Sequence, residues 1–409
     1  MLDWDSIFAT RSSRMRASEI RELLKLLDQP DIISFAGGIP DPALFPDQAF
    51  KEAYSDIFAG PAVAAALQYS VSEGYLPLRQ WLVGEMAKIG VPCEAENILI
   101  TSGSQQALDY LGKLFLSPND TALVTWPTYL GALQAFNAYE PSYDQLSPGG
   151  NRTPEAYRET AAKAGGAVKF AYLSADFSNP TGETVDRAGR EKLLDLADEL
   201  DIAVIEDGAY QYLRFDGEPV APILALDIAR KGGINETRTI YSGSFSKTLA
   251  PGLRVGYVVA AAPVIRKLVL MKQAADLHSS TINQMAICHV AERGFDQQVQ
   301  KVRSVYSQRR DAMLAALGRH MPSGVSWTEP EGGMFVWITL PAGMDGAALL
   351  AKSIAKAKVA FVPGRAFFAD GSGANTLRVS FSCANEQMIE EGISRLGRLI
   401  AGELVAKVA

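Results

Sequence analysis

The middle of the chain alternates short, almost wholly apolar runs with segments whose apolar positions recur every three or four residues. The apolar runs are NILI (97–100), ALVTW (122–126), KFAYL (169–173), IAVIE (202–206), TIYS (239–242) and RVGYVVA (254–260). The intervening segments include GREKLLDLADEL (189–200), whose leucines fall on one helical face. Strands that are apolar on both sides and alternate with amphipathic helices indicate an α/β protein with a mainly parallel, helix-covered sheet.

The pattern changes on either side of this region. After about residue 285, a long helical stretch leads into GGMFVWITL and NTLRVSFS, which is typical of a smaller α+β domain. Near the N-terminus, ASEIRELLKLLDQP predicts a helix that starts near Ser18, because serine is a favoured N-cap residue. We therefore expect an N-terminal arm and helix (1–50), a large domain (51–285) and a small C-terminal domain (286–409).

Composition and charge narrow the classes of function. The 409 residues are 48% hydrophobic and 21% charged, as in globular proteins with a large core. The net charge of −7 argues against a nucleic-acid surface. The three cysteines lie far apart, and neither a signal peptide nor a membrane-spanning apolar run is visible, so we expect a cytoplasmic protein. The three histidines have no metal-ligand spacing, and we expect no metal site.

Polar residues follow the apolar runs, at the places where parallel sheets bind their ligands. TSGSQQAL (101–108) combines a small-residue turn with a helix start, which suits a phosphate group. The later runs are followed by Tyr129, Asn179, Asp207, Tyr210, Ser244, Lys247 and Arg254. We expect these side chains to converge on one small molecule.

The chemistry of this set selects the small molecule. A lysine can form a Schiff base with an aldehyde, and a carboxylate can keep a pyridine nitrogen protonated. The Gly/Ser turn and Arg254 would hold a phosphate monoester. An aldehyde, a pyridine nitrogen and a phosphate together describe pyridoxal 5′-phosphate (PLP).

Five motifs, in order along the chain, resemble those of class I/II aminotransferases of PLP fold type I: TSGSQQAL, SNPTG, EDGAY, SGSFSKTLAPGLRVG and NTLRVSFS. Within that family, IRELLKL, FAGGIPDPALFP, LQYSVSEGY and GGMFVW are similar to the 2-aminoadipate and kynurenine aminotransferase branch. The resemblance implies a seven-stranded sheet, a small α+β domain with an N-terminal arm, and a homodimer with shared active sites. It also implies a ping-pong exchange of an amino group between an L-amino acid (2-aminoadipate, glutamate, branched-chain or aromatic) and a 2-oxo acid.

The resemblance also implies the role of each site residue. Lys247 would be the Schiff-base lysine and proton carrier, with Asp207 and Tyr210 as the other catalytic residues. The cofactor would further contact Gly103, Ser104, Gln105, Tyr129, Asn179, Ser244 and Arg254, and Tyr69 from a neighbouring subunit. Arg378 would bind the substrate carboxylate in a two-pronged pair, with Asn179, Gly38 and Arg21 as further substrate contacts.

Two alternatives remain open at this point. A β-lyase, decarboxylase or racemase would use the same cofactor residues, although Arg378 favours cleavage of the Cα–H bond. A PLP-sensing regulator would need a DNA-binding domain, for which the chain leaves no room before the predicted N-terminal helix. The chain also departs from closer relatives, which often carry proline near Ala175 and Asp176.

Overall fold

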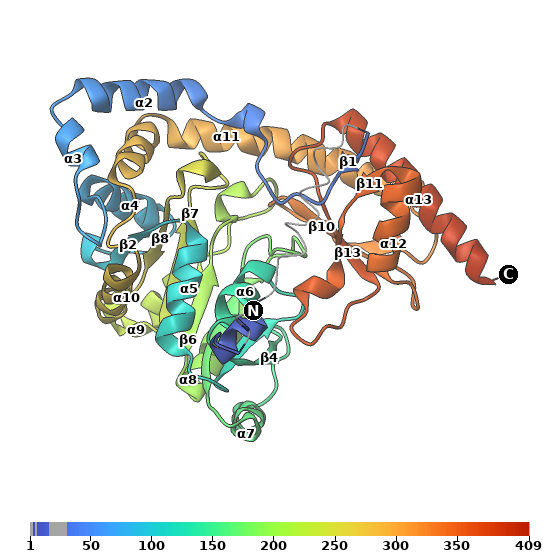
Figure 1. The fold of residues 1–409 in the computed structure, drawn as a ribbon, viewed down its shortest axis with the longest axis horizontal. Helices are drawn as coiled ribbons and strands as arrows, with labels where there is room; N and C mark the ends of the chain where they lie inside the picture. Colours follow the sequence, from blue (N-terminus) through green and yellow to red (C-terminus); the bar gives the residue numbers. More distant parts are fainter. Residues whose placement is uncertain (1–2, 5, 16–30, 409) are drawn as a thin grey trace.

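The computed structural model describes residues 3–4, 6–15 and 31–408, and its centre is a seven-stranded sheet (Figure 1). The strands are β2 (Ile98–Thr101), β3 (Thr121–Thr125), β4 (Ser142–Leu146), β5 (Val168–Leu173), β6 (Ala203–Asp207), β7 (Thr239–Ser244) and β8 (Gly256–Val259). They are ordered β2-β8-β7-β6-β5-β3-β4, and only β8 runs antiparallel to its neighbours. The predicted fold class is thereby confirmed.

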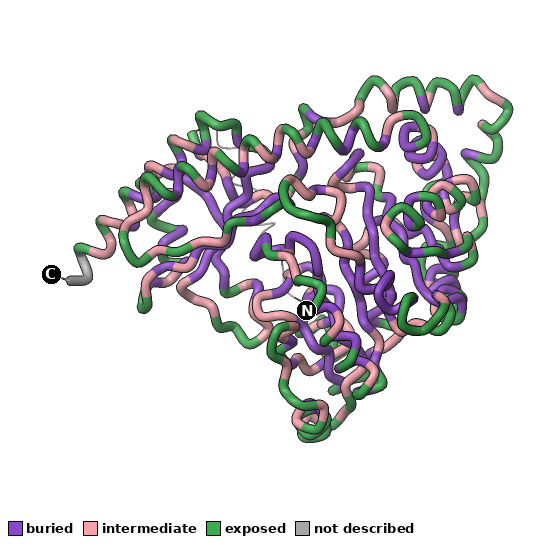
Figure 2. Tube along the Cα trace, turned by 180° about the vertical axis from the view of Figure 1, so that it is seen from behind, coloured by how far each residue is buried: buried purple, intermediate pink, exposed green. Residues whose placement is uncertain are grey.

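Helices cover both faces of this sheet because successive strand residues point to opposite sides. Tyr172 packs in a cluster with α5 (Ser104–Phe115), α6 (Leu130–Asn137) and α10 (Ala262–Ala275). Its neighbour Leu173 packs with α7 (Pro154–Ala164), α8 (Arg187–Leu200) and α9 (Ile223–Lys231). Apart from the edge strand β4, the strands are therefore largely buried on both faces, as the purple trace through the sheet shows (Figure 2).

The helix α11 (Thr281–His320) connects the sheet region to the C-terminal part of the chain (Figure 1). Its first half packs against α2 (Asp47–Ala59), α3 (Val63–Leu67) and α4 (Leu76–Lys88), and it also packs against α13 (Glu386–Val408). The helix kinks at Gly294, and the boundary expected between residues 285 and 286 falls inside its first turns.

The C-terminal part contains a second, four-stranded sheet. Its order is β12 (Val362–Pro363), β13 (Thr376–Ser380), β10 (Phe335–Thr339) and β9 (Ser326–Trp327), with α12 (Gly346–Lys352) and α13 beside it. The strand β1 (Ile33–Ser34) pairs in parallel with β11 (Val359–Ala360). This pairing brings the segment after residue 30 against the C-terminal part.

Short helical turns complete the described chain. They are η1 (Thr10–Arg14), η3 (Pro42–Leu44), η4 (Ala95–Asn97), η5 (Gln211–Leu213), η6 (Ile234–Glu236), η7 (Pro251–Leu253), η8 (Ser353–Ala357) and η9 (Gly364–Phe367). The helix expected from Ser18 onward lies outside the described residues. None of the described helices is both long and apolar enough to cross a bilayer.

Candidate functional site

The ends of the strands meet at one edge of the large sheet and line a cavity of about 250 Å³. The carboxyl ends of the parallel strands lie there, and so does the start of β8, because an antiparallel strand begins where its neighbours end. The wall contains most of the residues expected from the sequence: Gly38, Ser104, Gln105, Tyr129, Asn179, Asp207, Tyr210, Ser244, Lys247, Arg254 and Arg378.

Two expected site residues are not part of this wall. Gly103 directly precedes the first wall residue of α5. Tyr69 is outside the wall and 79% exposed, with its ring edge-on to His278. Arg21 lies outside the described residues.

Lys247 follows β7 on a short turn, and its amine lies inside the cavity. Its Nζ donates to the Gly38 carbonyl oxygen at 3.0 Å. Burial lowers the pKa of Lys247 to about 8, with further lowering by Arg378 and Arg254, while Asp207 opposes the shift. A large fraction of this amine is therefore neutral, and nucleophilic, near pH 8.

Asp207 ends β6 and supplies the carboxylate of the cavity. Its Oδ2 accepts a hydrogen bond from the Tyr172 hydroxyl at 2.8 Å, and its Oδ1 accepts one from the Ala209 N–H at 3.3 Å. Burial raises the pKa of Asp207, although both hydrogen bonds and Lys247 favour the charged form. A protonated ring nitrogen facing this carboxylate would stabilise its negative charge.

The start of α5 and Arg254 form a cup suited to a phosphate. Gly103 adopts a φ of 86°, and a Cβ there would lie 2.4 Å from Nη2 of Arg254. A side chain at this position would thus displace the guanidinium. Arg254 itself has a left-handed backbone, with φ 54° and ψ 51°. The N-terminal N–H groups of α5 and this guanidinium both favour an anion at this place.

Arg378 lies on β13, on the side of the cavity formed by the C-terminal part. It is 1% exposed, and its Nη1 donates to Asn179 Oδ1 at 2.7 Å and its Nη2 to the Ala36 carbonyl oxygen at 2.9 Å. Its buried Nε has no partner among the described residues. The Phe335 ring lies 4.2 Å from its Cζ, and burial lowers its pKa to about 10.

The charges of the wall do not balance. Lys247, Arg254 and Arg378 have no carboxylate within ion-pair distance in the part of the chain described by the structure, and the wall contains one acid, Asp207. The three unpaired cations, of which Arg378 is buried, Lys247 half-buried and Arg254 exposed, favour ligands with more than one negative charge. A phosphate ester and a carboxylate, bound together, would offset this surplus. Among the described residues, no cluster of side chains is arranged to hold a metal ion.

The sequence interpretation missed several residues of the site. The Tyr172 hydroxyl reaches Asp207, and Ser174 Oγ donates to the Asp207 carbonyl oxygen at 3.1 Å. The signal for Tyr172 was weak, since a tyrosine inside an apolar strand usually serves the core. Ser174, as the first polar residue after β5, fits the strand-end criterion that identified the other residues. Ile39 lines the cavity from the N-terminal loop, where no strand end marks it.

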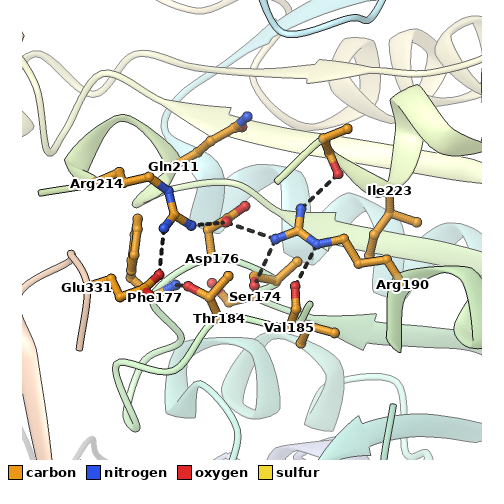
Figure 3. A network of polar contacts seen from close by, with 12 residues as sticks. Ser174, Asp176, Phe177, Thr184, Val185, Arg190, Gln211, Arg214, Ile223 and Glu331 are labelled. Carbon is orange, nitrogen blue, oxygen red and sulfur yellow. Dashed lines mark hydrogen bonds and ion pairs between the residues drawn. The ribbon is translucent and has the colours of Figure 1, made fainter. Parts of the chain in front are cut away.

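A buried ionic network stabilises the loop that carries Asn179 (Figure 3). Asp176 Oδ1 accepts from Arg190 Nη2 at 2.8 Å and from Arg214 Nη2 at 3.4 Å. Arg190 is fully buried and also donates to the carbonyls of Val185, Ala221 and Ala175. Arg214 continues to Glu331, at 2.7 Å, in the C-terminal part. The network therefore ties the Asn179 loop to both parts of the molecule.

Comparisons with known proteins agree with this architecture. The family described as aminotransferase class I and II matches residues 33–396. The chain is 44% identical to aromatic-amino-acid aminotransferase 1 of Thermococcus litoralis, over 98% of this chain and 96% of that protein. It is 44% identical to the 2-aminoadipate transaminase of Thermus thermophilus, over 98% of each. The crystal structure of the alpha-aminoadipate aminotransferase LysN from Thermus thermophilus, complexed with N-(5′-phosphopyridoxyl)-L-leucine, matches with a TM-score of 0.88 at 41% identity, covering 99% of this chain and 100% of that chain.

We predict that Asp176→Ala lowers the free energy of unfolding by about 3–5 kcal/mol, because it removes the carboxylate hydrogen-bonded to the buried Arg190 and leaves this arginine with Glu206 alone, at 3.9 Å. Glu331→Ala is the matched control: its side chain is 55% exposed, and we expect a loss below about 1 kcal/mol. Denaturant-induced unfolding at one fixed protein concentration measures both. Equal losses in the two variants would contradict this view of the network.

Proposed function

The chain belongs to the class I and II aminotransferase family, and we propose that it exchanges amino groups between 2-oxo acids and L-amino acids of the 2-aminoadipate, glutamate, branched-chain and aromatic types. It is a PLP-dependent aminotransferase of fold type I. The surplus of positive charge around Asp207 carries the site assignment, because it suits a phosphate and a substrate carboxylate bound together.

The residues present fit the cofactor. When bound, PLP supplies an aldehyde that reacts with amines and a ring that accepts the electrons of a broken Cα–H bond. Lys247 would bind the aldehyde carbon, and Asp207 would face the ring nitrogen. The phosphate would lie among Ser104, Gln105, Ser244 and Arg254, the ring face against Tyr129, and the phenolic oxygen near Asn179 and Tyr210.

Lys247 and Arg378 would handle the substrate. A neutral Lys247 amine can take the proton from the substrate Cα in the first half-reaction. In the second half-reaction it can return a proton to the Cα of the amino acid that forms. The Arg378 guanidinium would hold the α-carboxylate with paired N–H groups, one of them the Nε that has no partner among the described residues. That grip fixes the rotation of the substrate about Cα and so selects the bond that breaks.

Contacts near the substrate carboxylate support the proposed role of Gly38. A Cβ on Gly38 would lie 3.0 Å from the Phe335 ring and 3.6 Å from Arg378 Nη2. The absent side chain thus keeps room beside the carboxylate site. The aromatic and 2-aminoadipate parts of the proposed range are supported by the activities for which the two relatives are named, and the branched-chain part by the leucine adduct in the LysN structure. Glutamate as a substrate and the role of Arg21 stay proposals from the sequence.

We also propose a homodimer in the cytoplasm, with the domain division at residues 50 and 285. Large apolar side chains are exposed between the end of α2 and the start of α4, and after α10: Phe58, Leu67, Tyr69, Val71, Leu76 and Leu277. The Tyr69–His278 ring contact brings two of these segments together. Apolar surface of this kind favours a protein partner, and a second copy would let Tyr69 reach the phosphate of the other subunit.

Single half-reactions test the proposed function. In the absence of a 2-oxo acid, we expect 2-aminoadipate, glutamate, leucine and phenylalanine each to shift the visible absorbance of the bound cofactor and to yield one equivalent of oxo acid. Lys247→Ala should still bind PLP but lose turnover by at least about 10²–10⁴-fold, whereas the exposed Lys267→Ala should retain it. Release of pyruvate and ammonia from cysteine without an acceptor would favour a β-lyase instead.

The lowered pKa of Lys247 predicts how cofactor loading depends on pH. The amine reacts only when neutral, so the rate of covalent loading of cofactor-free protein should rise with pH up to about 8 and level off above it. Nα-acetyl-lysine, with an ordinary amine, is the control and should keep rising beyond about pH 9. A protein rate that follows the control would show that Lys247 is not perturbed.

The dimer proposal makes a separate prediction. Sedimentation should give twice the 44.1 kDa of one chain. Tyr69→Phe should keep that mass but raise the dissociation constant for PLP about tenfold, because it removes one hydrogen bond to a charged phosphate. A monomer, or unchanged PLP affinity in Tyr69→Phe, would contradict the shared site.

A further inference from the structure

A second cavity, of about 620 Å³, lies behind the wall of the first. It is lined by the end of α4, the turn η5, residues 219–222 and the middle of α11. The turn η5 separates the two cavities: Tyr210, just before it, lines the first, and Tyr212 lines the second. Its volume is within the range of small-molecule sites.

Most charges in the wall of the second cavity are already paired. Lys88 Nζ lies 2.6 Å from Glu85 Oε1 and 3.4 Å from Asp296 Oδ2. Arg214 is paired with Asp176, as described above. Lys88 and Arg214 therefore already have carboxylate partners of their own and are not left over for a further anion.

Arg303 is the exception. Its Nε donates to the Tyr212 carbonyl oxygen at 2.6 Å, which fixes the base of the guanidinium against η5. Its two terminal nitrogens have no hydrogen bond or ion pair within the described ranges 3–4, 6–15 and 31–408. Burial and the nearby Arg214 lower the pKa of Arg303, whereas Asp296 and Tyr212 raise it, although Asp296 makes neither a hydrogen bond nor an ion pair with this guanidinium. A carboxylate would pair with the two terminal nitrogens.

The remaining wall is largely apolar. Ile89, Val299 and the segment 219–222, which reads PVAP, line the cavity beside Arg303. A ligand with one negative charge and a short hydrocarbon body would match both features. A second negative charge on the ligand would find no free cation in this wall and would be repelled by the carboxylates of Glu85, Asp176 and Asp296.

We propose that this second cavity binds a small aliphatic monocarboxylate, with its carboxylate on the terminal nitrogens of Arg303 and its chain between Ile89 and Val299. The site is distinct from the substrate site at Arg378. It does not depend on the proposed aminotransferase substrates, because neither an amino nor an oxo group of the ligand is required.

Equilibrium dialysis of PLP-loaded protein with radiolabelled 4-methylpentanoate tests the proposal. This acid lacks amino and oxo groups and cannot turn over. We expect two equivalents bound per chain, one at Arg378 and one at Arg303. Arg303→Gln should weaken the second by at least about tenfold and leave the first, whereas Arg378→Gln should do the reverse. Lys301→Gln, which removes an exposed positive charge from the same helix, should keep both equivalents.

A second variant guards against loss of structure. Gln300→Glu places a carboxylate three residues before Arg303 on α11, where such a pair supports the helix and would compete with the ligand. We expect it to unfold no more readily than the original protein and to lose the second equivalent. The proposal is overturned if the original protein binds a single equivalent, or if Arg303→Gln and Gln300→Glu both bind two with unchanged affinity.

Discussion

The direction of the strands is the constraint on which the site depends. Parallel strands deliver all their carboxyl ends to one edge, and the antiparallel β8 adds its own beginning at the same edge. Lys247 after β7 and Arg254 before β8 thus lie beside the same cavity, although a loop of several residues separates them in sequence. A β8 running parallel to β7 would carry Arg254 to the opposite edge, and the phosphate cup would lose its cation.

Unpaired cations at this edge raise the free energy of the folded, cofactor-free protein. The same cations make the site selective for ligands with negative charges. The same neighbours that favour a phosphate and a carboxylate also lower the pKa of Lys247. Ligands that bind the folded state and offset this charge stabilise it by mass action. Affinity for the cofactor, reactivity of Lys247 and folding stability are therefore coupled, because all three depend on the same surplus of positive charge.

The parts of this architecture that could be predicted were those with a local signal. Apolar runs marked the buried strands, and turn residues after them marked the site, since both depend on neighbours in sequence. The edge strand β4 was missed because three of the five residues in SYDQL are polar, so the segment contains no apolar run. The pairing of Arg214 with Glu331 could not be predicted, because 117 residues separate them and charged residues alone do not identify their partners.

The N-terminal loop that lines the site could not be predicted either, because its contacts join residues that are far apart in the sequence. The carbonyls of Ala36 and Gly38 accept from Arg378 and Lys247, so the N-terminal loop occupies donors that the substrate and the cofactor would use. Arg309 and Asp41, both largely buried and 2.7 Å apart, hold the far end of this loop against α11. The pairing of β1 with β11 holds its near end. Because both ends are fixed, the carbonyl oxygens of this loop stay in place, and Lys247 must turn its amine away from the Gly38 carbonyl before it can bind the cofactor.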